Sequence, residues 1–260
     1  MNHDQAKKAA NILWDAYNNK KQIDSLPRSL RAETIEDGYI IQDQLVKVSG
    51  AKLRGYKVGA TNKSVQARFG VDMPFSGRIL EPFILQGPAI IPKNTVNFYA
   101  IEAEFDFLIG KTLPPRSTSY SREEIYNSID TILPAIELPD SRYKNWLNVS
   151  APDLIADNAI SGILVLGSPI KIPLPRNLSD AEVIIKVNDN IVSQGIGKNV
   201  LEDPWNVIFW LVEHLNERGL GLMAGDIITT GSTTDVIHCK PQDNVECDFG
   251  KYGSVSLYFE

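Results

Sequence analysis

Two glutamates spaced two residues apart are the first side chains in this sequence that could carry out chemistry. They are Glu102 and Glu104, within FYAIEAEFDF at residues 98–107. On a β-strand, residues two apart share a face, and their Cα atoms lie roughly 6.6 Å apart. Two ionised carboxylates at that spacing repel each other in a partly buried site, so a cation or a bound proton must compensate. Asp106 is the next acid on the same predicted face.

A third glutamate favours a metal ion as the compensating charge. Glu137 lies in the apolar segment LPAIELP at residues 133–139, where a glutamate needs a partner. Carboxylate oxygens are preferred by hard ions, so three of them predict Mg²⁺ or Mn²⁺. Zinc is disfavoured because His3, His214 and His238 form no paired ligand motif.

Other kinds of site have less support. The sequence has no G-x-S-x-G elbow of a serine hydrolase and no GxxxxGK[ST] phosphate loop. Gly195 and Gly197 lack the third glycine of a dinucleotide-binding motif. A strand with one solvated acidic face remains the plain alternative for the glutamate pair, and a glycosidase-like pair of carboxylates remains open by residue type.

Composition excludes several partners. The chain has 260 residues and a net charge of −6, so nucleic acid and anionic membranes would be repelled on average. No stretch of about 18 apolar residues could span a bilayer, and the N-terminal segment lacks the apolar core of a secretory signal. Two cysteines, Cys239 and Cys247, are too few for a disulfide framework. We therefore expect a cytoplasmic protein.

The elements that must position the acids fall into two regions. Residues 1–52 are predicted to be helical, with an amphipathic helix near the start and a second one beginning near Thr34. Residues 53–260 contain short β-like segments separated by Gly, Pro, Asn and Asp. Because helices come first and many strands follow, the sequence predicts an α+β fold rather than an alternating βαβ sheet.

Two helices are predicted to interrupt the β-rich region. One covers residues 121–130 and begins with a capping-box pattern. The other lies within residues 203–219, with Asp203 as its N-cap and Gly219 after its last turn. Asp189 and Asn190 lie between two β-like segments and predict a tight hairpin turn.

Further short motifs occur in a set order along the chain. They are GYKVGAT (55–61), IEAEF (101–105), PAIE (134–137) with DSR (140–142), ADNA (156–159), GDII (225–228) with GS (231–232), and GSVS (253–256). In this order the chain resembles the 2-keto-4-pentenoate hydratase and 4-oxalocrotonate decarboxylase family, which is related to fumarylacetoacetate hydrolase. Each motif is weak alone, but together they are specific and cover roughly residues 35–260.

The resemblance implies a mixed β-roll or barrel-like core of the fumarylacetoacetate hydrolase C-terminal type, behind an N-terminal helical region. It implies that Glu102, Glu104 and Glu137 are the metal ligands and that Lys57 is the active-site lysine. Lys57 is expected to transfer a proton or to anchor the substrate anion, with an ordinary surface lysine as the alternative.

The resemblance also identifies residues around the expected pocket. Ser161 and Ser232 are expected to contact the substrate. Asp157 and Asn158 are expected either to orient the site or to cap backbone groups.

One segment departs from the family pattern. Many hydratases carry Pro-Asp-Phe-Gly after the lysine motif, whereas residues 74–77 read PFSG here. Phe75 therefore stands where the family has an acid, and Asp72 lies three residues earlier. If that acid relays protons in the hydratases, this chain uses another group or another substrate.

By resemblance, the expected activity is metal-dependent addition of water to a 2-hydroxy-2,4-dienoate (a 2-oxo-4-enoate), which gives a 4-hydroxy-2-oxo acid in the catabolism of aromatic-type compounds. A decarboxylase of a 2-oxo-3-enedioate is the nearest alternative, because the same metal-bound electron sink serves both reactions. A C–C hydrolase of acylpyruvate type is less favoured, because it needs a recognisable acid–base pair to activate the attacking water. A non-catalytic partner subunit is the remaining alternative. The expected partners are a small 2-oxo acid, further copies of the chain in a homo-oligomer, and a pathway enzyme.

Overall fold

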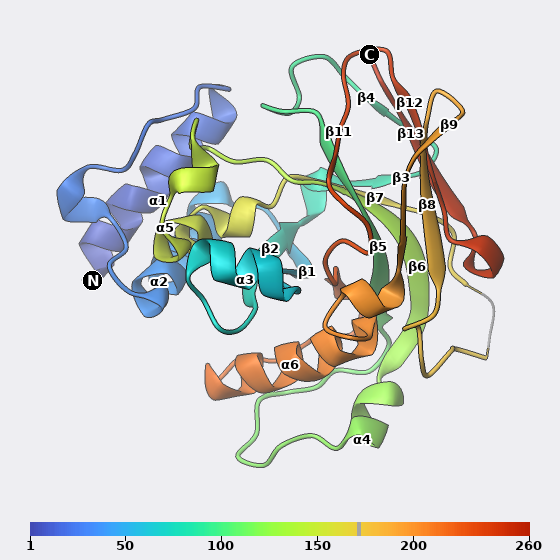
Figure 1. Cartoon of the computed structure of the whole chain (residues 1–260). Coiled ribbons are helices and arrows are strands. Elements are labelled where there is room, and N and C mark those ends of the chain that lie inside the picture. Colours follow the sequence, from blue (N-terminus) through green and yellow to red (C-terminus); the bar gives the residue numbers. More distant parts are fainter. Residues whose placement is uncertain (171–172) are drawn as a thin grey trace.

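Two β-sheets form the centre of the protein in the computed structural model, which describes residues 1–170 and 173–260 (Figure 1). The larger sheet has the order β2-β1-β10-β5-β6-β7-β3, with β11 paired to β5. Its strands are β1 (Leu53–Gly59), β2 (Phe75–Leu80), β3 (Ile84–Gln86), β5 (Ala100–Ile109), β6 (Ile129–Leu138), β7 (Ile163–Leu166), β10 (Ile227–Ile228) and β11 (Ile237–His238).

The smaller sheet has the order β4-β13-β12-β8-β9. Its strands are β4 (Ala89–Ile91), β8 (Glu182–Val187), β9 (Asn190–Ile196), β12 (Asn244–Asp248) and β13 (Ser254–Phe259). The pairs β1–β10, β3–β7 and β4–β13 are parallel and the other pairs are antiparallel. The predicted mixed α+β architecture is confirmed.

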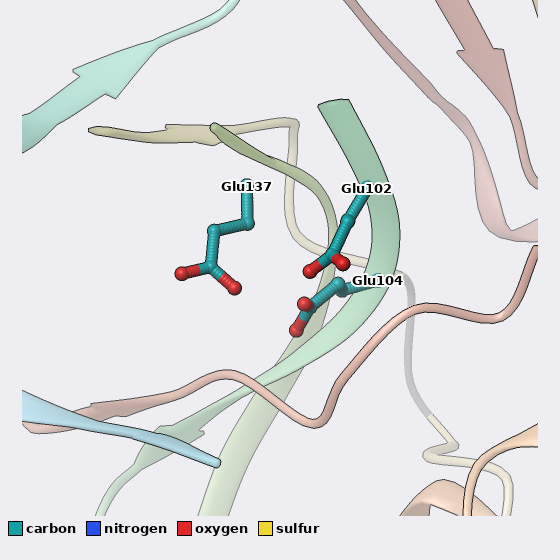
Figure 2. A group of neighbouring side chains, drawn as sticks. All are labelled: Glu102, Glu104 and Glu137. Atoms are coloured by element: carbon teal, nitrogen blue, oxygen red, sulfur yellow. The ribbon is translucent and has the colours of Figure 1, made fainter. Parts of the chain in front are cut away.

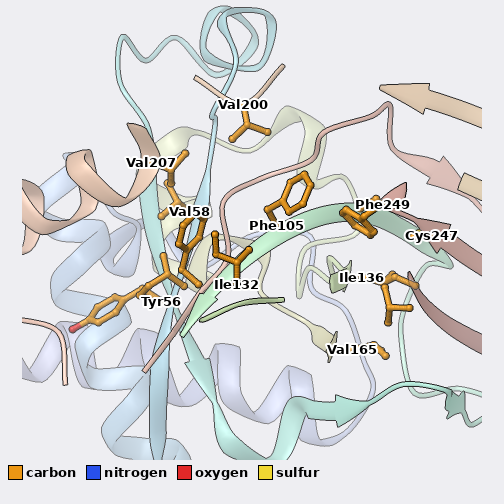
Figure 3. Close-up of a cluster of buried hydrophobic side chains, with 14 of the residues drawn as sticks. Tyr56, Val58, Phe105, Ile132, Ile136, Val165, Val200, Val207, Cys247 and Phe249 are labelled. Atoms are coloured by element: carbon orange, nitrogen blue, oxygen red, sulfur yellow. The ribbon is translucent and has the colours of Figure 1, made fainter. Parts of the chain in front are cut away.

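The main hydrophobic core lies against the apolar face of β5 (Figure 3). The Phe105 ring makes edge contacts with the rings of Phe249 and Tyr252, at centroid distances of 5.0 and 5.6 Å. Phe107 packs edge-on against Trp205 at 4.7 Å. Because side chains alternate along a strand, these contacts turn the acidic residues of β5 to the opposite face.

The N-terminal helices form a second hydrophobic cluster beside the sheets (Figure 1). Helix α1 (His3–Asn18) packs against α2 (Ile35–Ser49), and α2 also packs against α5 (Ala151–Ala156). Helix α2 begins next to Thr34, as predicted, and Thr34 caps it, because its hydroxyl accepts the backbone N–H of Asp37. The division into regions 1–52 and 53–260 stays a prediction.

The other helices are α3 (Lys63–Phe69), α4 (Arg122–Tyr126) and α6 (Pro204–Glu217), and short 3-10 turns cover Arg28–Leu30, Glu81–Phe83, Trp146–Asn148, Asn158–Ile160, Gly197–Asn199 and Gly250–Tyr252. Within the described ranges, no helix is both long and apolar enough to cross a membrane. Helix α6 is confirmed, including its Asp203 cap, whose carboxylate accepts the backbone N–H of Trp205 at 2.9 Å.

Two local predictions were wrong in detail. The helix predicted for residues 121–130 ends at Tyr126, because the following residues enter β6 and pair with β5. The hairpin turn lies at Asn188 and Asp189, which have positive φ angles of 50° and 64°, and Asn190 already belongs to β9. Positive φ at both central residues is typical of a type I′ turn, whose twist matches the right-handed twist of the two strands that it joins.

His214 on α6 provides a pH-dependent contribution to stability. Its half-buried ring stacks on Trp210 at 4.7 Å, and burial, followed by the charges of Arg218 and Arg78, lowers its pKa to about 4. The unfolded chain, with a pKa of 6.5, therefore binds the proton first as the pH falls. This contribution is present above pH 6.5 and is lost between about pH 6.5 and 4.

We expect the free energy of unfolding of His214→Gln to fall less steeply than that of the wild type across this window. Urea unfolding of both proteins at a series of pH values measures the difference. Identical pH dependence in the two proteins would show that His214 takes up its proton equally well when folded.

Candidate active site

The three predicted glutamates converge (Figure 2). Strands β5 and β6 are antiparallel neighbours, and their register places Glu102 opposite Glu137 and Glu104 opposite Ala135. Each glutamate offers a carboxylate oxygen, and these oxygens lie within 4.8 Å of one another. Because Glu104 and Asp106 are fully buried and Glu102 is partly buried, the alternative of a solvated acidic strand face is wrong.

Two of the three glutamates are buried and the third is partly buried, which raises the energy of their charged forms. Glu104 is fully buried, Glu137 is 3% exposed and Glu102 is partly buried. Burial, followed by the charge of Glu137, raises the pKa of Glu102 to about 7, and the same causes raise the pKa of Glu104 well above its usual range. Such a cluster needs positive charge to stay ionised.

Glu104 is held by a backbone group. Its Oε2 accepts the N–H of Gly231 at 2.8 Å, whereas its buried Oε1 has no hydrogen-bond partner among the residues that the structure describes. Gly231 has a φ of +93°, and a Cβ there would lie 2.0 Å from the Thr61 hydroxyl oxygen. Glycine is therefore required for this N–H to reach the carboxylate.

Lys57 supplies positive charge to the cluster. Its Nζ lies 2.7 Å from Oε1 of Glu137, and the residue is 3% exposed, so the alternative of a surface lysine is wrong. Burial lowers the pKa of its ammonium group, but the charges of Glu137 and Glu102 outweigh burial and raise the pKa overall. Gly77 lies opposite Lys57, and a Cβ there would approach Lys57 Cγ to 2.9 Å.

Phe75 places an apolar ring where the family pattern has an acid. It lies opposite Gly59 in the β1–β2 register, two residues from the Lys57–Gly77 pair and therefore on the same face of the sheet. Phe75 is buried, and its ring lies 3.2 Å from the position of a Cβ at Gly59. Proton transfer by a carboxylate at this position is excluded.

Asp157 and Asn158 make buried hydrogen bonds to neighbouring segments of the chain. The Asp157 carboxylate accepts hydrogen bonds from Nε of Arg142 and, at 2.7 Å, from the Ser141 hydroxyl, and Nη1 of Arg142 donates to the carbonyl of Ser161 at 3.0 Å. The Asn158 side chain accepts the backbone N–H of Arg78 at 2.7 Å and donates to its carbonyl at 2.9 Å. These bonds fix the Ser161 segment and strand β2.

Asp157→Asn is expected to lower the free energy of unfolding by about 3–5 kcal/mol, because it leaves the buried guanidinium of Arg142 without an anion. Urea unfolding measures the change. The matched control is Glu123→Gln, which removes a carboxylate from an exposed pair with Arg176 and should leave stability nearly unchanged. Equal effects of the two substitutions would contradict the structural role of Asp157.

The two serines differ in their placement. Ser161 lines a small cavity together with Lys57, Glu137 and Thr229. The hydroxyl of Ser232 donates to the carbonyl of Thr234 at 2.9 Å. Ser232 directly follows Gly231, whose backbone N–H binds the Glu104 carboxylate. Substrate contact by either serine stays a prediction.

Two buried residues near the cluster were not predicted as part of the site. The alternation of side chains along the strand predicted that Asp106 shares a face with Glu102 and Glu104. Burial, followed by the charge of Glu137, raises its pKa well above the usual range. Thr229 follows the two-residue strand β10, and its position depends on long-range pairing that leaves no local pattern.

The sequence and fold define the protein class. Residues 67–257 match the family described as fumarylacetoacetate (FAA) hydrolase C-terminal, and the chain belongs to this family. It is 31% identical to 2-keto-4-pentenoate hydratase of Paraburkholderia xenovorans (strain LB400), over 100% of this chain and 97% of that protein. It is also 31% identical to 2-oxo-hept-4-ene-1,7-dioate hydratase of Escherichia coli, over 96% of each chain.

Among solved structures, the chain resembles 4-oxalocrotonate decarboxylase from Pseudomonas putida G7, complexed with magnesium and adipate. The TM-score is 0.92 at 26% identity, over 100% of this chain and 99% of that chain. A fumarylpyruvate hydrolase from Pseudomonas aeruginosa, in complex with Mn²⁺ and pyruvate, shares the fold with a TM-score of 0.61 at 13% identity, over 80% of this chain and 89% of that chain.

Proposed function

We propose that this protein is a divalent-metal-dependent hydratase that converts a 2-hydroxy-2,4-dienoate into a 4-hydroxy-2-oxo acid during breakdown of aromatic compounds. The observation that carries the proposal is the convergence of Glu102, Glu104 and Glu137 beside the buried Lys57. Relatives of full length that are named hydratases support the reaction type.

The residues of the cluster fit one hard dication. When ionised, the three glutamates and Lys57 leave two net negative charges, which one dication neutralises. The unpartnered Oε1 of Glu104 is a buried oxygen that a metal ion would satisfy. An all-carboxylate set favours Mg²⁺ or Mn²⁺ over zinc. When bound, the ion would act as a Lewis acid on the C2 oxygen of a 2-oxo acid.

The reaction requires proton transfers that the chain must perform. The enol proton is released and a proton is added at C5, after which water adds its hydroxyl at C4 and a proton at C3. Lys57 is the proposed group for proton transfer or for holding the negative charge of the substrate, because it is buried against Glu137 and Phe75 leaves no acid on that strand face. Ser161, on the cavity wall beside Lys57, and Ser232 are the proposed substrate contacts.

Decarboxylation of a 2-oxo-3-enedioate is the second candidate. The similarity to 4-oxalocrotonate decarboxylase, with a TM-score of 0.92 over the whole chain, favours it specifically. Loss of CO₂ uses the same polarised 2-oxo group, so the cluster serves either reaction. A non-catalytic partner subunit is disfavoured because Lys57 and the three glutamates are all in place.

Parallel assays distinguish these activities. Purified protein with Mg²⁺ or Mn²⁺ is offered 2-hydroxypenta-2,4-dienoate and, separately, 2-oxohex-3-enedioate. Loss of dienol absorbance without CO₂ supports the hydratase, and CO₂ release from the second compound supports the decarboxylase. Turnover of neither compound by metal-loaded protein would contradict both activities and favour the partner-subunit role.

We further propose that the protein acts as a homo-oligomer in a reducing cytoplasm. Ile90 and Tyr258, partners in the β4–β13 register, expose apolar side chains by 61% and 39%, which favours assembly. Cys239 and Cys247 are free thiols. Analytical ultracentrifugation should give a mass of at least twice 28.9 kDa, and a monomer at micromolar concentration would contradict assembly.

A further inference from the structure

Asp106 is the third acid on the face of β5 that carries Glu102 and Glu104. It is fully buried, and neither of its carboxylate oxygens has a hydrogen-bond partner within residues 1–170 and 173–260. The residue opposite it on β6 is the apolar Leu133. A buried carboxyl group without partners is costly, so something other than a protein group must satisfy it.

The β10–β5 register pairs Ile228 with Phe107. Extending this register by one residue places Thr229 beside Asp106, on the side away from β6. The backbone N–H of Thr229 donates to Tyr56 at 3.0 Å, which also places it beside β1 and Lys57. The Thr229 hydroxyl is buried and has no hydrogen-bond partner in the described part of the chain.

A small cavity connects Thr229 to the cluster. Thr229, Lys57, Glu137 and Ser161 line it, and its volume of about 10 Å³ holds about one water molecule. Water there would have the Thr229 hydroxyl, the Lys57 ammonium and the Glu137 carboxylate as polar partners. A buried water needs about three hydrogen bonds, and these three groups can supply them.

We propose that the Thr229 hydroxyl binds a buried water that also contacts the Lys57–Glu137 pair. Asp106 orients this hydroxyl from the opposite side through a second buried water that bridges the two side chains. The two residues thereby position Glu137 and Lys57. The inference rests on the proposed metal-dependent function, since Glu137 is a proposed ligand. Asp106 and Thr229 are positioning residues, because they act through the ligand and not on the substrate.

The test is Mn²⁺ affinity, measured by electron paramagnetic resonance on the purified full-length chain. Groups that orient metal ligands typically change metal affinity by about 10–100-fold, and we expect losses in this range for Asp106→Asn and Thr229→Val. Thr229→Ser keeps the hydroxyl and should retain the wild-type affinity. Glu246→Gln, on the smaller sheet, removes the same charge at a partly exposed site and should also bind normally.

Urea unfolding of the metal-free proteins separates positioning from a purely structural role. Asp106→Asn should be at least as stable as the wild type, because the carboxylate it replaces has no protein partner. Normal Mn²⁺ affinity in both Asp106→Asn and Thr229→Val, with binding lost in Glu104→Gln, would overturn this inference and leave the proposed function intact. A wild-type protein that binds no Mn²⁺ would overturn both.

Discussion

Glu104→Gln is expected to lose dication binding and turnover together, with metal affinity reduced by more than about 100-fold. Substitution of a residue that only orients metal ligands lowers metal affinity by about 10–100-fold. Removal of a charged ligand should lower it further. The amide cannot supply the negative charge, although its carbonyl can still accept the N–H of Gly231 at the position of Oε2. Isothermal titration with Mn²⁺ and a dienoate turnover assay measure both effects.

The fold should survive this substitution. Burial, followed by the charge of Glu137, disfavours the Glu104 carboxylate in the metal-free protein, so a neutral amide relieves repulsion there. We therefore expect urea unfolding of metal-free Glu104→Gln at a midpoint no lower than that of the wild type. Retained turnover in this variant would remove Glu104 from the site.

Lys57→Met is expected to separate catalysis from metal binding. The side chain is buried against Glu137, and proton transfer by a positioned group contributes about 10²–10⁴-fold to rate, so kcat should fall by a factor in that range. Mn²⁺ affinity should be equal or tighter, because the substitution removes a positive charge that competes for Glu137. Steady-state kinetics and Mn²⁺ titration on the same preparation measure the two quantities.

The matched control for this variant is Lys186→Met on the smaller sheet, which removes a lysine paired with the partly exposed Glu246. It should leave both kcat and Mn²⁺ affinity unchanged. If Lys57→Met lost Mn²⁺ binding in a folded protein, Lys57 would be needed to build the site and its assignment as a chemical group would be wrong.

The local parts of the site were predictable from sequence. Alternation along FYAIEAEFDF placed Glu102 and Glu104 on one face, because the period of a strand is two residues. Glu137 was identified by its apolar surroundings, where an unpaired carboxylate is costly. The start of α2 near Thr34 and the Asp203 cap of α6 were also predictable, because the start of a helix depends on residues within one turn.

The long-range parts were not predictable in the same way. The register that places Glu137 opposite Glu102 follows from the pairing of two strands, and composition does not specify that pairing. Strand β10 has two residues, Ile227 and Ile228, so no periodicity could identify Thr229 as the neighbour of Asp106. Lys57 was predicted through the family resemblance, because its contact with Glu137 joins strands that are far apart in the sequence.

The missing acid at Phe75 could be identified from the sequence, but the surroundings of Phe75 could not. The sequence identified a missing acid, and the structure places an aromatic ring on the face that also bears Lys57. Asp106 is a buried acid on another strand of the same sheet. Whether a residue faces a site can be read from its strand period, but which residues meet across a sheet depends on the complete fold.

The central claim is that three carboxylates bind one dication, and the position of the metal ion tests it most directly. Crystals of the protein grown with Mn²⁺ should show one anomalous peak per chain, about 2.0–2.3 Å from an oxygen of each of Glu102, Glu104 and Glu137. A peak at any other place, or a chain in which one of these carboxylates points away from the ion, would contradict the account.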